Sequence, residues 1–379
     1  MTPVSGRVHL PSAGSRPPVP TAGASRPVSP RGFHRTMPGY AATAARSLPQ
    51  VAAGLGVGEV WVKDESSRLG LPSFKVLGGS WAVHRALMER VGEPFAERGF
   101  ADLVAVAAGL GPLTLTTATD GNHGRGVARV ARLLGLDSVV YVPDDMVPAR
   151  IAGIESEGAR VVVHDGDYDA AVARSAAAAE EHGWLSVADV AYDGADPVPR
   201  WVIEGYDTIF AECDEQLPGP VTTLLVQAGV GALAGAALQH YALRGHGTRC
   251  AVVEPLQAAC LLESAVSGGP ISLASSQGSA MAGLNCGTPS AVAWPWVHAC
   301  TDVYLAVADA RAFEAMQLLA AAGIESGESG AAGLAGLLEV GGDPTVRAAL
   351  GLDQHARVLV VNTEGATDPE AYRRIVAPD

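Results

Sequence analysis

From Val57 onward, short valine-rich runs alternate with alanine-rich stretches of helical length. The runs include VWVKD, TLTTATDG, SVVYVPDD, ARVVVHDG and WLSVAD, and later VTTLLVQAG, CAVVEP and ARVLVVNTEG. Continuous apolar runs are typical of strands buried on both faces, and parallel strands need a long crossover, usually a helix, between them. The alternation therefore predicts an α/β protein with mostly parallel sheets.

Helices are expected between these runs, over SFKVLGGSWAVHRALMER, through VARVARLLG, over VPARIAGIESEG and from Asp167 to His182. In open parallel sheets, ligands gather at the carboxyl ends of the strands, so polar residues that follow predicted strands are candidates for a shared site. These candidates are Asp120, Asp189, Gln227 to Gly231, Glu254 and Thr363.

Composition limits the ligands that such a site can take. The 379 residues, 48% of them hydrophobic, are enough for about two domains. No apolar stretch is long enough to span a bilayer, and the net charge of -14 disfavours nucleic acid and anionic lipid. Five cysteines without a CxxC spacing indicate neither a zinc site nor a disulfide framework, so we expect no metal and reduced thiols in a cytoplasmic protein. A small molecule is the expected partner.

Residues 1–32 are rich in Pro, Ser, Gly and Arg and contain no acidic residue. Such a composition buries little apolar surface, so we interpret this segment as a disordered tail; a transit peptide and a misassigned start codon are the alternatives. Approximate boundaries near Trp81 and Val190 divide the rest of the chain into two domains. We expect a large domain of residues 33–80 and 190–379 and a small domain of residues 81–189.

Lys75 lies in PSFKVLGG, after a polar turn and at the start of an apolar helix. An amine placed in a cleft is partly desolvated, which lowers a lysine pKa and favours attack on an aldehyde. A solvated surface lysine is the simpler interpretation of this segment alone.

Two glycine-containing turns also indicate a ligand-binding site. QAGVGALAGA follows an apolar run and opens a helix, and its free amides are suited to cradle a phosphate, although a close packing turn would look similar. This turn has neither GxGxxG nor GxxxxGK[ST] spacing, which argues against a dinucleotide or ATP. TATDGNHGRG places Asp120, Asn122 and His123 beside three glycines, which exceeds what a turn needs even if Asn122 caps the helix.

Seven blocks in one order resemble the diaminopropionate ammonia-lyases: KDESSRLGLPSFKVLGG, ATDGNHGRGVA, QAGVGALAG, VVEP, MAGLNCG, SGESGAAGL and NTEGATDPEAY. The resemblance runs from about Phe33 to Tyr372. This family is a branch of the fold type II pyridoxal phosphate enzymes, which include threonine dehydratase and the tryptophan synthase β chain. It implies two open, mostly parallel sheets flanked by helices, with the site in the cleft between a large and a small domain.

The resemblance also implies roles for single residues. Lys75 would form the Schiff base with pyridoxal phosphate, and Asn122 would hydrogen-bond the phenolic oxygen of the cofactor. The amides of Ala228, Gly229, Val230 and Gly231 would bind its phosphate, and the Thr363 hydroxyl would meet its pyridine nitrogen. Asp120 would act as an acid or base at the α carbon, and Asp189 would be a second carboxylate near the substrate amines.

The resemblance implies α,β-elimination from 2,3-diaminopropionate, which gives pyruvate and ammonia. It also implies that the protein is a homodimer. Cys260 and Cys286 would approach each other near the site entrance, as a pair or as free thiols. Three rival functions remain open: a serine or threonine dehydratase, a β-replacement enzyme for another β-substituted alanine, and a non-catalytic module on the same fold.

Departures from the family pattern bear on the substrate more than on the cofactor. Tyr40 is followed by AATAA where a Pro-Thr-Pro-Leu type segment is usual, and we expect this to loosen a segment near the substrate carboxylate. Asn362 stands where a serine is expected, and Ala366 stands where an aspartate is common. Contacts with the cofactor ring are therefore expected to differ.

Overall fold

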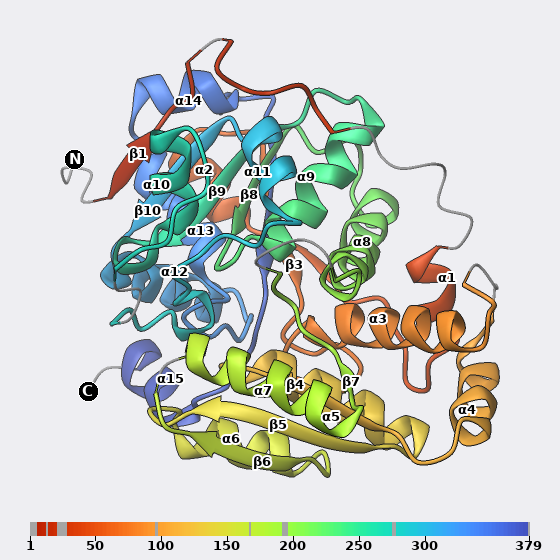
Figure 1. Cartoon of the computed structure of the whole chain (residues 1–379). Coiled ribbons are helices and arrows are strands. Elements are labelled where there is room, and N and C mark those ends of the chain that lie inside the picture. The colour runs from red at the N-terminus through yellow and green to blue at the C-terminus, as the bar shows by residue number, and fades with distance from the viewer. Residues whose placement is uncertain are drawn as a thin grey trace.

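The strands in the described part of the chain form two sheets, which lie one above the other in Figure 1. The computed structural model describes residues 6–12, 14–20, 29–94, 98–166, 168–191, 196–274 and 278–377. The predicted α/β class with two open, mostly parallel sheets is confirmed.

The larger sheet has seven strands in the order β1-β10-β9-β8-β11-β3-β2. Its five central strands are parallel, whereas β1 and β2 pair antiparallel at the two edges. The strands are β1 (Arg7–His9), β2 (Ala45–Ser47), β3 (Glu59–Asp64), β8 (Thr223–Gln227), β9 (Arg249–Pro255), β10 (Val303–Val307) and β11 (Arg357–Asn362). The buried valine-rich runs therefore form the centre of the sheet, as expected for strands covered on both faces.

The smaller sheet has four parallel strands in the order β6-β5-β4-β7. They are β4 (Thr114–Ala118), β5 (Asp137–Pro143), β6 (Arg160–His164) and β7 (Leu185–Ser186). We propose that a small domain, residues 81–189, is set against a large domain of residues 33–80 and 190–379. The sheets support this division, because every strand of the smaller sheet comes from between residues 114 and 186.

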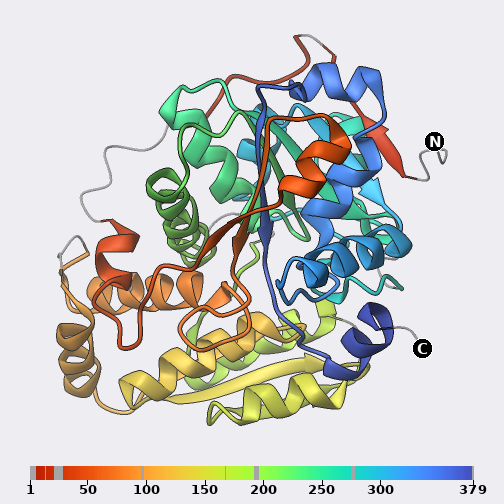
Figure 2. The same cartoon turned by 180° about the vertical axis from the view of Figure 1, so that it is seen from behind.

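Helices cover both sheets, and Figures 1 and 2 show them from opposite sides. The expected helix from Asp167 begins at Tyr168 in the structure, and Asp167 lies outside the described residues. The helices are α1 (Pro30–His34), α2 (Pro49–Leu55), α3 (Lys75–Arg90), α4 (Phe100–Gly109), α5 (Asn122–Leu134), α6 (Pro148–Glu155), α7 (Tyr168–His182), α8 (Val198–Gln216), α9 (Ala232–Arg244), α10 (Cys260–Ser267), α11 (Trp294–Cys300), α12 (Asp309–Ala321), α13 (Ala332–Val340), α14 (Pro344–Leu350) and α15 (Pro369–Val376).

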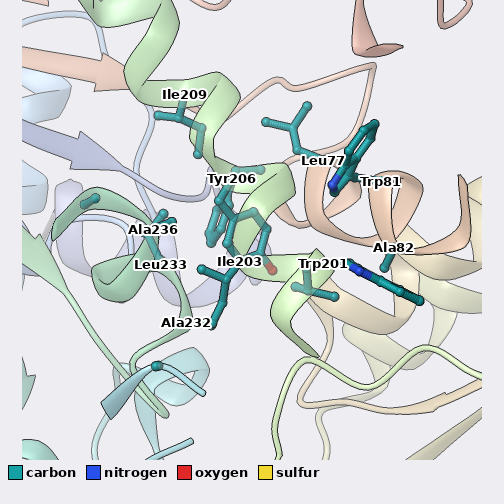
Figure 3. Close-up of a cluster of buried hydrophobic side chains, with 14 of the residues drawn as sticks. Leu77, Trp81, Ala82, Trp201, Ile203, Tyr206, Ile209, Ala232, Leu233 and Ala236 are labelled. Atoms are coloured by element: carbon teal, nitrogen blue, oxygen red, sulfur yellow. The ribbon is translucent and has the colours of Figure 1, made fainter. Parts of the chain in front are cut away.

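Helix α3 packs between α8 and α5, and glycines allow both approaches. A Cβ on Gly205 would lie 2.8 Å from the Cα of Gly78 and 2.6 Å from the carbonyl oxygen of Leu77. On the other side, a Cβ on Gly126 would lie 3.0 Å from the backbone nitrogen of Val76. Figure 3 shows the buried side chains that fill the space between α3, α8 and α9, among them Trp81, Trp201, Tyr206 and Leu233.

A buried ionic network fixes the segment that precedes α3. Lys63 on β3 and Arg68 in the following turn both donate to Glu212 on α8, and all three side chains are fully buried. Tyr40 donates to the same carboxylate at 2.6 Å, and Thr43 donates to Glu65 at 2.6 Å. The expectation that AATAA leaves this segment loose is therefore wrong, because side-chain hydrogen bonds hold it in place of the missing prolines.

The interpretation of residues 1–32 as a disordered tail is wrong where this segment is described. Strand β1 pairs with β10, with Val8 opposite Leu305, and Arg16 donates to Asp302 at 2.9 Å. Helix α1 already begins at Pro30. The composition argument counts apolar burial, whereas an edge strand binds through its backbone and needs little apolar surface.

None of the helices in the described part of the chain combines the length and the apolar character that a membrane span requires.

Candidate active site

A pocket lies where the carboxyl ends of strands from both sheets meet. Its lining comes from the starts of α3 and α5, the turn after β8, the segment around residues 283–286 and the end of β11. The predicted site residues Lys75, Asp120, Asn122, Asp189, Ala228, Gly229, Val230, Gly231 and Thr363 all line it. Residues that are distant in the sequence are thus brought together.

Lys75 is the first residue of α3, and its Nζ donates to Asp189 Oδ2 at 2.7 Å. The side chain of Lys75 retains 21% exposure, and that of Asp189 retains 7%. Burial alone would lower the pKa of the Lys75 amine, but Asp189, Tyr206 and Asp120 together outweigh burial and raise this pKa above its ordinary value. The expectation that desolvation leaves a neutral amine is therefore wrong for the cofactor-free chain, in which Lys75 is an ammonium.

Asp189 follows β7 and is held as a carboxylate. Burial alone would raise its pKa, but His123 and Lys75 outweigh burial and lower the pKa of Asp189 to about 2. The His123 Nδ1 lies 3.7 Å from Asp189 Oδ2, and its Nε2 donates to the carbonyl oxygen of Val187 at 2.7 Å. Because burial lowers the pKa of His123 itself, Lys75 supplies the positive charge at neutral pH.

The TATDGNHGRG segment forms the turn between β4 and α5. Thr119 Oγ1 accepts hydrogen bonds from the amides of Gly121 (2.9 Å) and Gly124 (3.0 Å), so Thr119, and not Asn122, satisfies the start of the helix. Gly121 has φ = 141°, which favours glycine. Asp120 and Asn122 line the pocket, whereas His123 does not and lies behind Asp189.

The turn from β8 to α9 is a cradle of backbone amides. Gly231 has φ = 96°, and a Cβ on Gly229 would lie 2.8 Å from the Sγ of Cys286, so both positions depend on glycine. No backbone carbonyl in the described part of the chain accepts from Gly229, Val230 or Gly231. Ala228 is different, because its amide donates to Val253 at 2.9 Å. The prediction that the Ala228 amide binds a phosphate is therefore wrong, and the other three amides fit one.

At the end of β11, a glutamine fixes Thr363. Gln227 Nε2 lies 3.1 Å from Thr363 Oγ1 and also within 3.0 Å of the carbonyl oxygens of Ser329 and Gly330. Next to Thr363, burial raises the pKa of Glu364, and this carboxyl accepts from Asn122 Nδ2. An uncharged hydroxyl and a carboxyl with a raised pKa therefore border this side of the pocket.

Glu254 does not share this site, although it follows a predicted strand. Its carboxylate accepts from the amides of Leu261 and Leu262, both at 2.8 Å, at the start of α10. All five cysteines are free. Cys286 lines the pocket, and Cys260 Sγ donates to the carbonyl oxygen of Gly229 at 3.7 Å. The two thiols therefore both lie beside Gly229, as free thiols.

Other lining residues were not predicted as site residues, although most lie in blocks quoted for the resemblance. Asn285 and Cys286 lie in MAGLNCG, Ser329 in SGESGAAGL and Glu364 in NTEGATD. Tyr168 on α7 lies in no such block. Asn285 Oδ1 is buried without a hydrogen-bond partner in the described part of the chain, as expected for a wall that meets a polar ligand.

The family comparison agrees with this arrangement of a lysine, an amide cradle and a strand-end hydroxyl. The model of the pyridoxal-phosphate dependent enzyme family matches residues 36–364. The chain therefore belongs to the pyridoxal phosphate-dependent enzymes, and its architecture is that of fold type II. The predicted cofactor, pyridoxal 5'-phosphate, is confirmed at the level of the family.

Within this family, the similarity extends to individual relatives. Diaminopropionate ammonia-lyase from Salmonella typhimurium is 37% identical over 363 residues, which cover 91% of this chain and 90% of the relative. The Escherichia coli enzyme in complex with an aminoacrylate-PLP azomethine reaction intermediate has a TM-score of 0.87 and 33% identity, covering 99% of this chain and 98% of that one. The same enzyme in complex with D-serine has a TM-score of 0.88 and 34% identity, with coverages of 99% and 98%.

Proposed function

We propose that the chain eliminates ammonia from 2,3-diaminopropionate, and that pyruvate and ammonia are the products. The Lys75–Asp189 pair in an acid-lined pocket is the observation that carries this proposal. Similarity to diaminopropionate ammonia-lyases over 91% of the chain supports the same substrate. When bound, pyridoxal phosphate supplies the electron sink for loss of the α proton.

The residues that line the pocket have separate roles in binding the cofactor. Lys75 would attach the cofactor, and the amides of Gly229, Val230 and Gly231 would hold its phosphate. The Thr363 hydroxyl, positioned by Gln227, would meet the pyridine nitrogen, and Asn122 would meet the phenolic oxygen. These roles agree with the positions of all these residues around one pocket.

Proton transfer falls to Lys75 and Asp120, because both side chains line the pocket. Asp120 is suited to act as an acid or base at the α carbon, and Asp189 to hold an ammonium of the substrate once Lys75 is engaged elsewhere. The Asp189 carboxylate, with its pKa of about 2, stays charged at neutral pH.

The pocket charges favour a diamino acid over the rival substrates. Asp120, Asp189 and Glu364 line the pocket against one cationic side chain, Lys75. Serine and threonine bring no second cation, whereas diaminopropionate brings a β-ammonium for this surplus of acid. We therefore rank a serine or threonine dehydratase and a β-replacement enzyme below the ammonia-lyase.

The test is a substrate comparison on the purified protein loaded with pyridoxal phosphate. D- and L-2,3-diaminopropionate, L-serine and L-threonine are supplied separately, and keto acid is assayed with a coupled dehydrogenase. We expect pyruvate chiefly from diaminopropionate, and at least a 10³-fold lower rate in Lys75→Ala, together with loss of the visible band of the bound cofactor. Turnover of L-serine alone would replace this proposal with the dehydratase.

We further propose that the protein is a cytoplasmic homodimer. The resemblance to the family supports the dimer, and the five free cysteines agree with a reducing compartment. Light scattering during size-exclusion chromatography gives the mass directly, and twice the 38.7 kDa of one chain is the expected value.

A further inference from the structure

Glu364, which follows β11, lies where three segments of the active site meet. Its backbone forms an isolated bridge to Ser73, two residues before Lys75, and its carbonyl oxygen accepts from the amide of Gly327 at 3.1 Å. Glu364 is 1% exposed, and it lines the pocket. A Cβ on Gly327 would lie 2.9 Å from Glu364 Oε1, so glycine at this position leaves room for the carboxyl. Neighbouring segments therefore fix a buried carboxyl at the wall of the pocket.

A side-chain partner of this carboxyl is Asn122, the first residue of α5. Asn122 Nδ2 donates to Glu364 Oε2, and the Asn122 side chain forms no further hydrogen bond within the described part of the chain. One end of an asparagine amide carries two N–H donors and the other end is an oxygen that only accepts, although the two ends have nearly the same shape. If the amide turned over, two acceptor oxygens would face each other. Glu364 therefore determines how the amide is oriented, and it leaves the second N–H of Nδ2 for a ligand in the pocket.

The orientation of this amide matters for the cofactor. Under the proposed function, Asn122 meets the phenolic oxygen of pyridoxal phosphate, which accepts hydrogen bonds most strongly when it is ionised. An N–H of Asn122 stabilises this oxygen, whereas the amide oxygen would repel it. Burial raises the pKa of Glu364, but a carboxyl keeps an acceptor oxygen in either protonation state, so the orientation of the amide does not require a charge on Glu364.

We propose that Glu364 is a positioning residue that holds the Asn122 amide with an N–H directed at the phenolic oxygen of the cofactor. Glu364 acts through Asn122, and the two residues form one unit that recognises this oxygen. The inference rests on the cofactor contact proposed for Asn122 and adds the residue that selects the donor end of the amide. It concerns recognition of the cofactor, so it does not depend on which amino acid is the substrate.

The test compares binding of pyridoxal phosphate with binding of 3-deoxypyridoxal phosphate, an analogue in which hydrogen replaces the phenolic hydroxyl. Equilibrium dialysis of the cofactor-free full-length chain gives the Kd of both ligands, and the ratio of the two Kd values reports the contact with the phenolic oxygen. Glu364→Met removes the acceptor but keeps the length of the side chain. We expect it to weaken binding of pyridoxal phosphate by about 3- to 10-fold and to leave binding of the analogue within about twofold, because one hydrogen bond is lost.

Two further variants separate orientation from charge and from packing. Glu364→Gln is as uncharged as Glu364→Met but keeps an acceptor oxygen, so it should retain most of the preference for pyridoxal phosphate over the analogue. Glu157→Met is the control, because Glu157 also accepts from a side chain of α5, that of Arg129 at 2.9 Å, and does not line the pocket. It should leave the ratio of the two Kd values unchanged even if the protein is less stable.

Asn122→Ala measures the contact itself, and we expect it to reduce the preference by about 10-fold. When Glu364→Met and Asn122→Ala are combined, the loss should equal that of Asn122→Ala alone, since Glu364 acts through Asn122. Losses that add, or an equal weakening of both ligands in Glu364→Met, would overturn the inference. If Asn122→Ala leaves the preference unchanged, the contact proposed for Asn122 fails, and the inference fails with it. If only Glu364→Met leaves the preference unchanged, the inference alone fails.

Discussion

At the scale of single residues, the Lys75–Asp189 pair makes the cofactor-free protein sensitive to acid. The pKa of Asp189 is lowered to about 2 from an ordinary value of about 3.9. A lowered carboxyl pKa contributes stability that is present above the ordinary value and is lost as the pH falls towards 2. The raised pKa of Lys75 keeps the amine charged throughout this range.

We therefore expect Asp189→Asn to lower the free energy of unfolding of the cofactor-free protein by roughly 3 kcal/mol at pH 7, because a charge is left unpaired. The difference from wild type should shrink as the pH falls from about 4 towards 2, where the wild type loses the same charge. Urea unfolding at several pH values measures it, with Asp137→Asn, an exposed carboxylate at the start of β5, as the control. A difference that stays constant with pH would contradict the pairing.

At the scale of elements, the packing of α3 on α8 depends on glycines, and Gly205→Ala tests it. Its Cβ would lie 2.6 Å from the carbonyl oxygen of Leu77, so we expect a loss of about 1–3 kcal/mol in the free energy of unfolding. The rate of turnover should also fall, because α3 carries Lys75. Thermal unfolding and steady-state kinetics measure the two effects.

Gly54→Ala in α2 is the matched control. No atom lies within 4 Å of the Cβ that this substitution adds, so it should leave turnover unchanged and raise stability by about 0.5–1 kcal/mol. A Gly205→Ala protein as stable as wild type would show that the two helices can move apart without cost.

At the scale of the whole molecule, β1 covers the edge of β10. We expect removal of residues 1–20 to lower the free energy of unfolding by about 1–3 kcal/mol, because the backbone hydrogen bonds between these two strands are lost. Turnover by the folded protein should not change, because none of the described residues of this segment lines the active-site pocket. Urea unfolding and a kinetic assay measure the two quantities. Removing only the side-chain pairs, with Arg7→Ala and Arg16→Ala, should have little effect, since the two arginine side chains are 50% and 36% exposed and water screens their ion pairs.

The sequence was sufficient to predict the parallel sheets and most of the site lining. The alternation of runs predicts the central strands, and the motifs predict Lys75, Asp120 and the turn after β8, because these features are local. The roles of Thr119 and Ala228 were missed, since a hydrogen bond to a turn or to a neighbouring strand depends on what lies opposite in space. The pKa of Lys75 was misjudged for the same reason, because Asp189 is 114 residues away along the chain.

The contact between α3 and α5 has a consequence for the order of events in turnover. Gly126 lies against Val76, so the start of α3, which carries Lys75, is packed against the start of α5, which carries Asn122 and follows Asp120. Both groups that we propose to move the proton are therefore aligned before a substrate arrives. Such preorganisation removes the cost of bringing them together during the reaction, and leaves substrate capture and product release as the steps that can limit turnover.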